Sequence, residues 1–184
     1  MDLEYHSKAF YPDFLEMDQP MTIDEINSLS REEFVTALGW VFEHSPWVAE
    51  RAWMRRPFSD LDSLHRAMTE EVERATHEEQ LTLLRAHPDL GARASMSTAS
   101  AGEQSGVGLD RLTPEEYQRL QQSTADYRKK FGFPFLYAVK GSTKYDILRA
   151  LEQRLESSPA EEFRQALAQV YRIAMMRMKE VISI

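Results

Sequence analysis

Apolar residues recur along most of this chain at spacings of three and four residues, which is the period of an amphipathic helix and not of a strand. Helix start signals recur with them. Ser30 with Glu33 and Thr76 with Glu79 have the form of a capping box, in which each side chain bonds the other residue's backbone N–H. The pattern predicts an all-α bundle of about seven to eight helices.

Prolines and short polar residues mark further helix boundaries. Pro46 after Ser45 is expected at the first position of a helix that Pro57 closes, because a prolyl ring suits a helix start and disfavours helical backbone before it. Ser59 is expected to cap the next helix. Later helices are predicted to begin after Thr113, after Ser142 or Thr143, and after Ser158.

Two segments carry no helical pattern. The stretch 88–108 is rich in alanine, serine and glycine, and irregular segments of this length tend to be functional. Residues 133–139 follow Gly132, which is placed to end a helix. They are too apolar and too broken by Pro134 for another helix, which predicts an extended buried segment.

The length of 184 residues is that of one domain. We expect residues 21–184 to form it and residues 1–20, which are aperiodic, to form an N-terminal arm. No apolar run approaches the roughly 18 residues that span a bilayer. The net charge of -8 has the wrong sign for steering toward nucleic acid or anionic lipid. A small-molecule or protein partner is favoured, with no nucleic acid and no membrane, and the cytoplasm is the default location.

Several kinds of chemistry lack their residues. The chain has no cysteine, which excludes thiol nucleophiles, disulfides and iron–sulfur centres. None of its five histidines has a partner at the spacing of the HExxH zinc motif, so no metal site is predicted. The glycines of 106–108 lack the third glycine of a dinucleotide fingerprint, and the GxSxG motif is missing. A nucleotide cofactor and acyl transfer by an activated serine have no support.

His87 is the strongest candidate for proton transfer. It falls just beyond the C-terminus of a predicted helix, where carbonyl dipoles favour a protonated imidazole, and Pro88 keeps its backbone extended. Alone, however, this fragment is more often a helix cap than a catalytic site. Ser100 with Glu103 likewise has the form of a capping box, and the aromatic cluster around Pro134 is more often core than pocket.

Two arginines of one predicted helix differ in phase. Arg149 and Arg154 are five residues apart, which places them about 140° from each other around the axis. Arg154 precedes Leu155 on the flank of the apolar stripe, so its stem is expected to lie on the core and its guanidinium to reach a pocket. Arg149 is expected to be solvated. For both, the alternative is a surface ion pair.

Four motifs, in order along the chain, carry a family resemblance. They are Ala-His-Pro-Asp-Leu-Gly at 86–91, Ser-x-x-Glu-Gln at 100–104, Phe-Gly-Phe-Pro-Phe at 131–135 and Leu-Glu-x-Arg-Leu at 151–155. With these motifs the chain resembles the 2-oxo-4-hydroxy-4-carboxy-5-ureidoimidazoline (OHCU) decarboxylases, from about Phe34 to about Met178. Four ordered motifs are far more specific than any one of them.

The resemblance implies an all-α fold with a substrate pocket between helices, no metal or organic cofactor, and a homodimer. The implied reaction is decarboxylation of OHCU to (S)-allantoin and CO₂ in urate catabolism. Such chemistry can proceed without a cofactor, because the substrate ring has a C=N bond beside the departing carboxylate that can accept the electron pair. The protein must then orient the C–CO₂ bond, stabilise the moving charge and deliver a proton to one face.

By motif, the resemblance makes His87 the principal acid/base residue and Glu103 a second catalytic residue that bonds N–H groups of the substrate. Arg154 would hold an anionic oxygen of the substrate bidentately. The residues that the resemblance implies as substrate contacts are Pro88, Ser100, Glu103, Gln104, Phe135, Leu136, Tyr137, Ala138, Val139 and Arg154.

Two other functions stay open at this point. One is a cofactor-free hydrolase of a related ureide on the same scaffold, in which His87 and Glu103 activate water. The other is a non-catalytic helical interaction module, in which the same two residues are only helix caps.

Overall fold

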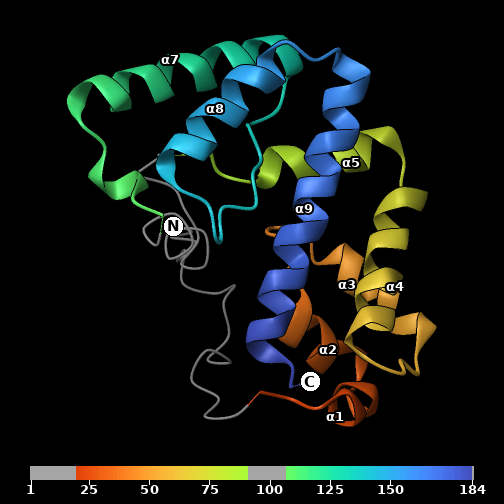
Figure 1. The fold of residues 1–184 in the computed structure, drawn as a ribbon. Helices are drawn as coiled ribbons and strands as arrows, with labels where there is room; N and C mark the ends of the chain where they lie inside the picture. Colours follow the sequence, from red (N-terminus) through yellow and green to blue (C-terminus); the bar gives the residue numbers. More distant parts are fainter. Residues whose placement is uncertain (1–19, 91–106, 184) are drawn as a thin grey trace, which may run out of the picture. The chain divides into compact units, whose positions relative to one another are not determined.

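The computed structural model describes residues 20–90 and 107–183, and this part of the chain is helical as expected (Figure 1). Short 3₁₀ turns, η2 (Trp53–Arg55) and η3 (Leu109–Arg111), accompany the α-helices. The α-helices of the described ranges are α1 (Ile23–Ser28), α2 (Arg31–Leu38), α3 (Trp47–Ala52), α4 (Leu61–Arg74), α5 (His77–Ala86), α7 (Pro114–Phe131), α8 (Lys144–Leu155) and α9 (Pro159–Val181).

The described residues form two compact units. One consists of the residues up to Ala75 together with those from Ala174 onward, and the other of residues from Thr76 to Ile173. The division falls within α9. No helix in the described ranges is long and apolar enough to cross a membrane.

Reciprocal capping boxes begin most of these helices. Each N-cap side chain accepts from the backbone N–H three residues later, and the side chain found there accepts from the N-cap N–H. The boxes predicted at Ser30 and Thr76 are confirmed, the helix predicted to begin after Thr113 also begins with a box, and Thr143, not Ser142, caps α8. At α9, Glu161 accepts from the N–H of Ser158, so that helix also begins where the sequence predicts.

Two predicted helix starts are wrong by one residue. Asp60 caps α4 in place of Ser59, because its carboxylate accepts from the Ser63 N–H at 2.7 Å. The Ser59 hydroxyl instead donates to Asp60 at 2.9 Å. Pro46 occupies the N-cap position of α3 and not its first position, and its carbonyl accepts from the N–H of Glu50.

Helix α1 was not predicted, although its start signal is present in the sequence. Thr22 and Glu25 form a capping box there. The helix has only six residues and one buried side chain, Ile26, so its apolar periodicity is too short to be recognised.

In the first unit, α3 packs against α2 and α4. The rings of Phe34 and Phe58 stack with their centroids 6.1 Å apart. The unit's buried charges are paired: Arg177 of α9 donates to Glu43 at 2.8 Å, with both side chains almost fully buried. The backbone of Met21 bonds to Val181, which ties the start of the described chain to its end.

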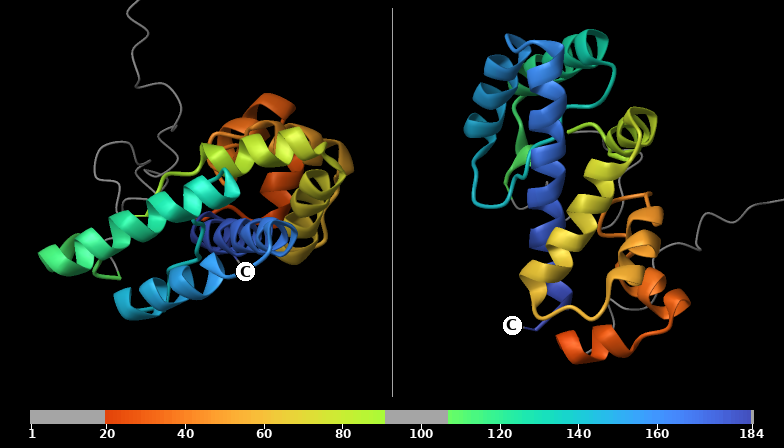
Figure 2. Two further views of the ribbon diagram at one scale, coloured as in Figure 1. Left: turned by 90° about the horizontal axis from the view of Figure 1, so that it is seen from above. Right: turned by 90° about the vertical axis from the view of Figure 1, so that its right-hand side faces the viewer.

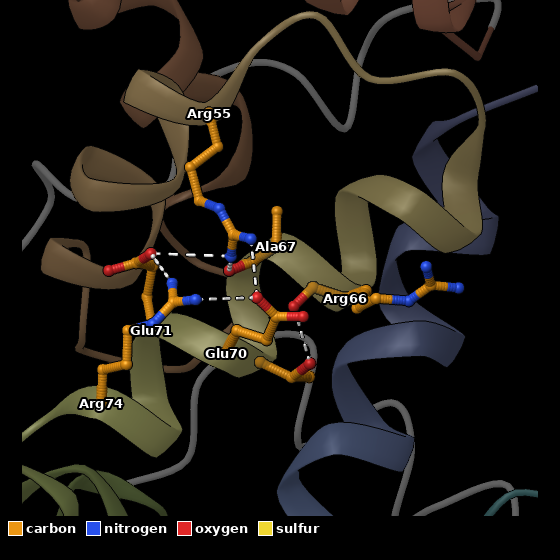
Figure 3. Close-up of polar contacts among 7 residues, drawn as sticks. Arg55, Arg66, Ala67, Glu70, Glu71 and Arg74 are labelled. Carbon is orange, nitrogen blue, oxygen red and sulfur yellow. Dashed lines mark hydrogen bonds and ion pairs between the residues drawn. The ribbon is translucent and has the colours of Figure 1, made fainter.

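A surface network of charges links the end of α3 to α4 (Figure 3). Arg55 donates to Glu70 at 2.6 Å and lies 3.7 Å from Glu71. Arg74, one turn further along α4, contacts the same two carboxylates at 3.2 Å and 3.0 Å. Because two cations alternate with two anions, each charge has an opposite neighbour, which fixes η2 against α4.

In the second unit, α7 and α8 lie side by side (Figures 1 and 2). Lys144 of α8 donates to Glu116 of α7 at 2.6 Å. Gly132 ends α7 in the left-handed conformation, with φ of 82°, as expected of a C-terminal glycine. Residues 133–139 then run as a non-helical, mostly buried segment, which confirms the burial and the absence of a helix predicted for them.

The carboxylates of the capping boxes make folding dependent on pH. Hydrogen bonds from Thr143 hold the pKa of Asp146 below its ordinary value of 3.8, and those from Ser30 hold the pKa of Glu33 below 4.5. A carboxylate whose pKa is depressed on folding contributes stability that is complete above its ordinary pKa and is lost as the pH falls through its folded pKa.

We therefore predict that the free energy of unfolding, measured by urea titration, decreases as the pH falls below the ordinary carboxyl values of 4.5 and 3.8. In Asp146→Asn, stability at neutral pH should fall and this part of the pH dependence should be shallower than in the wild type. An unchanged pH dependence in Asp146→Asn would contradict the prediction.

Candidate active site

His87 lies where the sequence predicts, at the C-terminal cap of α5. Pro88 follows it, and its backbone is extended, with φ of -77° and ψ of 143°. His87 is 5 % exposed, and its Nδ1 lies 2.9 Å from the carbonyl oxygen of Leu83, one turn earlier. A carbonyl only accepts, so Nδ1 carries the proton, and Nε2 is the atom that gains or loses one.

The residues around His87 are anchored to α7. Asp89 accepts from Arg128 of α7 at 2.6 Å. Arg85, in the last turn of α5, donates from Nε to the carbonyl of Gly132 at 2.9 Å. Since Gly132 directly precedes segment 133–139, the histidine motif and this segment are tied to each other.

Segment 133–139 contributes aromatic side chains to a buried cluster. Phe133 and Phe135 are 2 % and 1 % exposed. Their rings meet the Tyr127 ring edge-on, with centroids 6.0 Å and 5.2 Å from the Tyr127 centroid. Phe133 also meets Phe163 of α9 at 5.9 Å. The side chains at these two positions therefore belong to the core, which is the alternative that the aromatic composition favoured.

Arg154 is buried and Arg149 is not, as their helical phase predicts. The Arg149 side chain is 68 % exposed and lies 4.0 Å from Asp146. The Arg154 guanidinium donates to the Leu136 carbonyl at 2.6 Å and, through Nε, to Glu162 at 2.8 Å. Arg154 thus forms an ion pair as the alternative proposed, but a buried one.

Glu162 is at the centre of this network and is fully buried. Its Oε1 accepts from the Tyr127 hydroxyl and from two nitrogens of Arg154. Burial, followed by the hydrogen bond to Glu162, raises the pKa of Tyr127, so this hydroxyl stays protonated and acts as a donor. The guanidinium also lies 4.5 Å above the Phe135 ring.

Sequence reasoning missed Glu162, Tyr127 and Gln169 as members of a polar network. Gln169 of α9 is 4 % exposed and accepts from the Ala138 N–H at 2.9 Å. Gln169 is 31 residues from Ala138, and Glu162 is 35 residues from Tyr127 and 8 from Arg154 on a different helix, so no local signal marks these partners.

The predicted contacts Ser100, Glu103 and Gln104 lie outside the described residues, so their positions relative to His87 stay predictions. Of the predicted site residues, the described ones all belong to the second unit. Among residues 20–90 and 107–183, no three histidine, aspartate or glutamate side chains are grouped as metal ligands.

The family model for OHCU decarboxylase matches residues 27–179. The OHCU decarboxylase of Halalkalicoccus jeotgali is 46 % identical over 161 residues, which are 88 % of this chain and 92 % of that one. The OHCU decarboxylase of Haloferax volcanii is 48 % identical over 160 residues, 87 % and 95 % of the two chains. The crystal structure of an (S)-allantoin synthase superimposes with a TM-score of 0.74 at 32 % identity and covers 88 % of this chain and 54 % of that one.

The two arginines should differ in their contribution to stability. Arg154→Ala leaves the fully buried Glu162 without its cation and should cost about 3 to 5 kcal/mol in the free energy of unfolding. Arg149→Ala removes an exposed side chain and should change it by no more than about 0.5 kcal/mol. Urea unfolding of both variants checks this, and equal losses would show that the α8 phase is assigned wrongly.

Proposed function

The chain belongs to the OHCU decarboxylase family, and we propose that it decarboxylates OHCU to (S)-allantoin and CO₂ in urate catabolism, without a cofactor. The observation that carries the proposal is the match of the family model to residues 27–179, with relatives of that name aligned over nearly their whole length. The geometry of His87 also supports it, because the bond between Nδ1 and the Leu83 carbonyl fixes the ring and makes Nε2 the nitrogen that exchanges a proton.

The reaction requires little from the protein beyond orientation and a proton. The C–CO₂ bond breaks, and its electron pair moves into the adjacent C=N bond of the ring, whose nitrogen takes up a proton. A second proton must then reach the carbon that bears the ureido arm from one face, while the hydroxyl on the decarboxylated carbon loses its proton and becomes the carbonyl of allantoin, so that one proton is taken up in total. His87 is the proposed acid/base residue, acting through Nε2, because the bond of Nδ1 to Leu83 fixes the plane of the ring.

Glu103 is proposed to accept hydrogen bonds from N–H groups of the ring or ureido arm, with Ser100 and Gln104 as neutral polar contacts. Pro88 and residues 135–139 are proposed to line the substrate, with backbone groups and an apolar surface that excludes water. The Arg154 guanidinium is occupied by Glu162 and the Leu136 carbonyl, which favours a role through the backbone over direct substrate contact.

A homodimer that acts in the cytoplasm completes the proposal, and both parts rest on the family resemblance. Gel filtration with light scattering tests the dimer, and fractionation of the source cells tests the location.

The first test is stereochemical. With OHCU generated in situ from urate, the protein should yield one enantiomer, (S)-allantoin, because a fixed donor protonates one face, whereas spontaneous decay gives both. Circular dichroism of the product measures the ratio. A racemic product at saturating enzyme would contradict the decarboxylase function.

The second test asks whether His87 and Glu103 act on one transition state. His87→Asn and Glu103→Gln keep size and hydrogen-bonding capacity, so each should remove most of the activity while barely altering the melting temperature. The double variant should be little worse than the poorer single one, because residues that work as a unit are strongly non-additive.

Steady-state rates and thermal melts of the three variants decide between the roles. Full activity in His87→Asn would remove the acid/base assignment. Additive losses would indicate independent roles, and unfolding of a single variant would favour the helix-cap alternative.

A further inference from the structure

The substrate-lining segment is held at two alternate backbone groups by buried side chains. Arg154 of α8 donates to the Leu136 carbonyl at 2.6 Å, and Gln169 of α9 accepts from the Ala138 N–H at 2.9 Å. The two residues are 9 % and 4 % exposed. One side-chain donor and one side-chain acceptor thus bond the backbone of the segment on either side of Tyr137.

The same geometry directs the residue between them. The C=O and N–H of a trans peptide unit point in opposite directions, so the N–H of Tyr137 points away from Arg154 and the C=O of Tyr137 points away from Gln169. We propose that Arg154 and Gln169 are positioning residues, which hold residues 136 and 138 so that the peptide groups of Tyr137 face the substrate. The proposal rests on the function proposed above and adds to it how the backbone contacts are oriented.

Arg154 is itself held from two other helices. Glu162 of α9 accepts from its Nε at 2.8 Å, and the hydroxyl of Tyr127 of α7 donates to the same carboxylate oxygen. The guanidinium thereby donates from Nε and Nη2 to Glu162 and from Nη1 to the Leu136 carbonyl. A lysine ammonium, which is a point charge on a flexible stem, cannot reproduce both bonds at fixed angles.

Stability alone does not account for this arrangement. Replacing a buried ion pair by well-packed neutral side chains is often neutral or stabilising, because desolvation offsets the Coulomb attraction. The Leu136 carbonyl, however, receives a directed bond only from the arginine among the described residues. Orientation of the segment is therefore the property that the network supplies.

The experiment uses two variants that release the segment and one matched control. Gln169→Leu removes the acceptor for Ala138. The double substitution Arg154→Met/Glu162→Gln removes the donor to Leu136 without leaving a buried charge, so that the fold is kept. The control is Lys144→Met, which breaks the 2.6 Å ion pair of α8 with Glu116 of α7 but does not touch the segment.

Three quantities are measured for each variant and for the wild type. Amide hydrogen exchange of the peptide covering residues 133–139 reports the order of the segment without any substrate. Steady-state kinetics give kcat and KM for OHCU. The enantiomeric ratio of allantoin is compared at enzyme concentrations adjusted to equal total turnover, so that spontaneous decay contributes equally.

For Gln169→Leu and the double variant, we expect faster exchange in residues 133–139 and a kcat about 10- to 100-fold lower, because small misplacements of binding groups cost that much. The share of the second enantiomer should rise. In Lys144→Met all three quantities should match the wild type.

The outcomes separate the two proposals. Wild-type kcat and enantiomeric ratio in a folded Gln169→Leu, or unchanged exchange in both release variants, would overturn the positioning role. A wild-type protein that gives racemic allantoin would overturn the proposed function, while the exchange data would still decide whether Arg154 and Gln169 order the segment.

Discussion

A carboxylate with no exposed surface governs how the second unit is built. Burying an ionised carboxylate costs several kcal/mol unless charge and hydrogen bonds compensate it. Around Glu162 the compensation comes from Tyr127 of α7 and Arg154 of α8, so three helices converge on one oxygen atom. The guanidinium has a further N–H group, on Nη1, which donates to the Leu136 carbonyl. The position of Leu136 within segment 133–139 is thus linked to the neutralisation of one buried charge.

The helices were predictable because their signals are local. A capping box needs only two residues three positions apart, and Ser30, Thr76 and Thr113 each begin a helix where the sequence indicates. The errors are local too. At the start of α4, serine and aspartate stand side by side, and the ionised carboxylate, the stronger acceptor, takes the cap. A helix of six residues such as α1 offers too few apolar positions to reveal a period.

The site was predictable only in part, for the same physical reason. His87 is marked by its neighbours in sequence, a preceding helix and a following proline, and its backbone conformation follows from both. Glu162 contacts Tyr127 across 35 positions, and Arg177 pairs with Glu43 across 134. Such pairs depend on which helices become neighbours, which periodicity does not specify. The amphipathic phase of α8 did predict that Arg154 is buried, but not that a carboxylate of α9 would meet it.

The sequence left open whether His87 is a helix cap or an acid/base residue. In the structure the two roles are compatible. The bond from Nδ1 to the Leu83 carbonyl satisfies one of the last carbonyls of α5, as a C-terminal cap does. That bond also fixes the tautomer, so a neutral ring presents Nε2 as a base and a protonated ring presents it as an acid. Bonds from Arg85 to Gly132 and from Arg128 to Asp89 hold the same turn against α7 and segment 133–139. Capping therefore supplies the fixed orientation that the proposed proton transfer to one face of a planar ring requires.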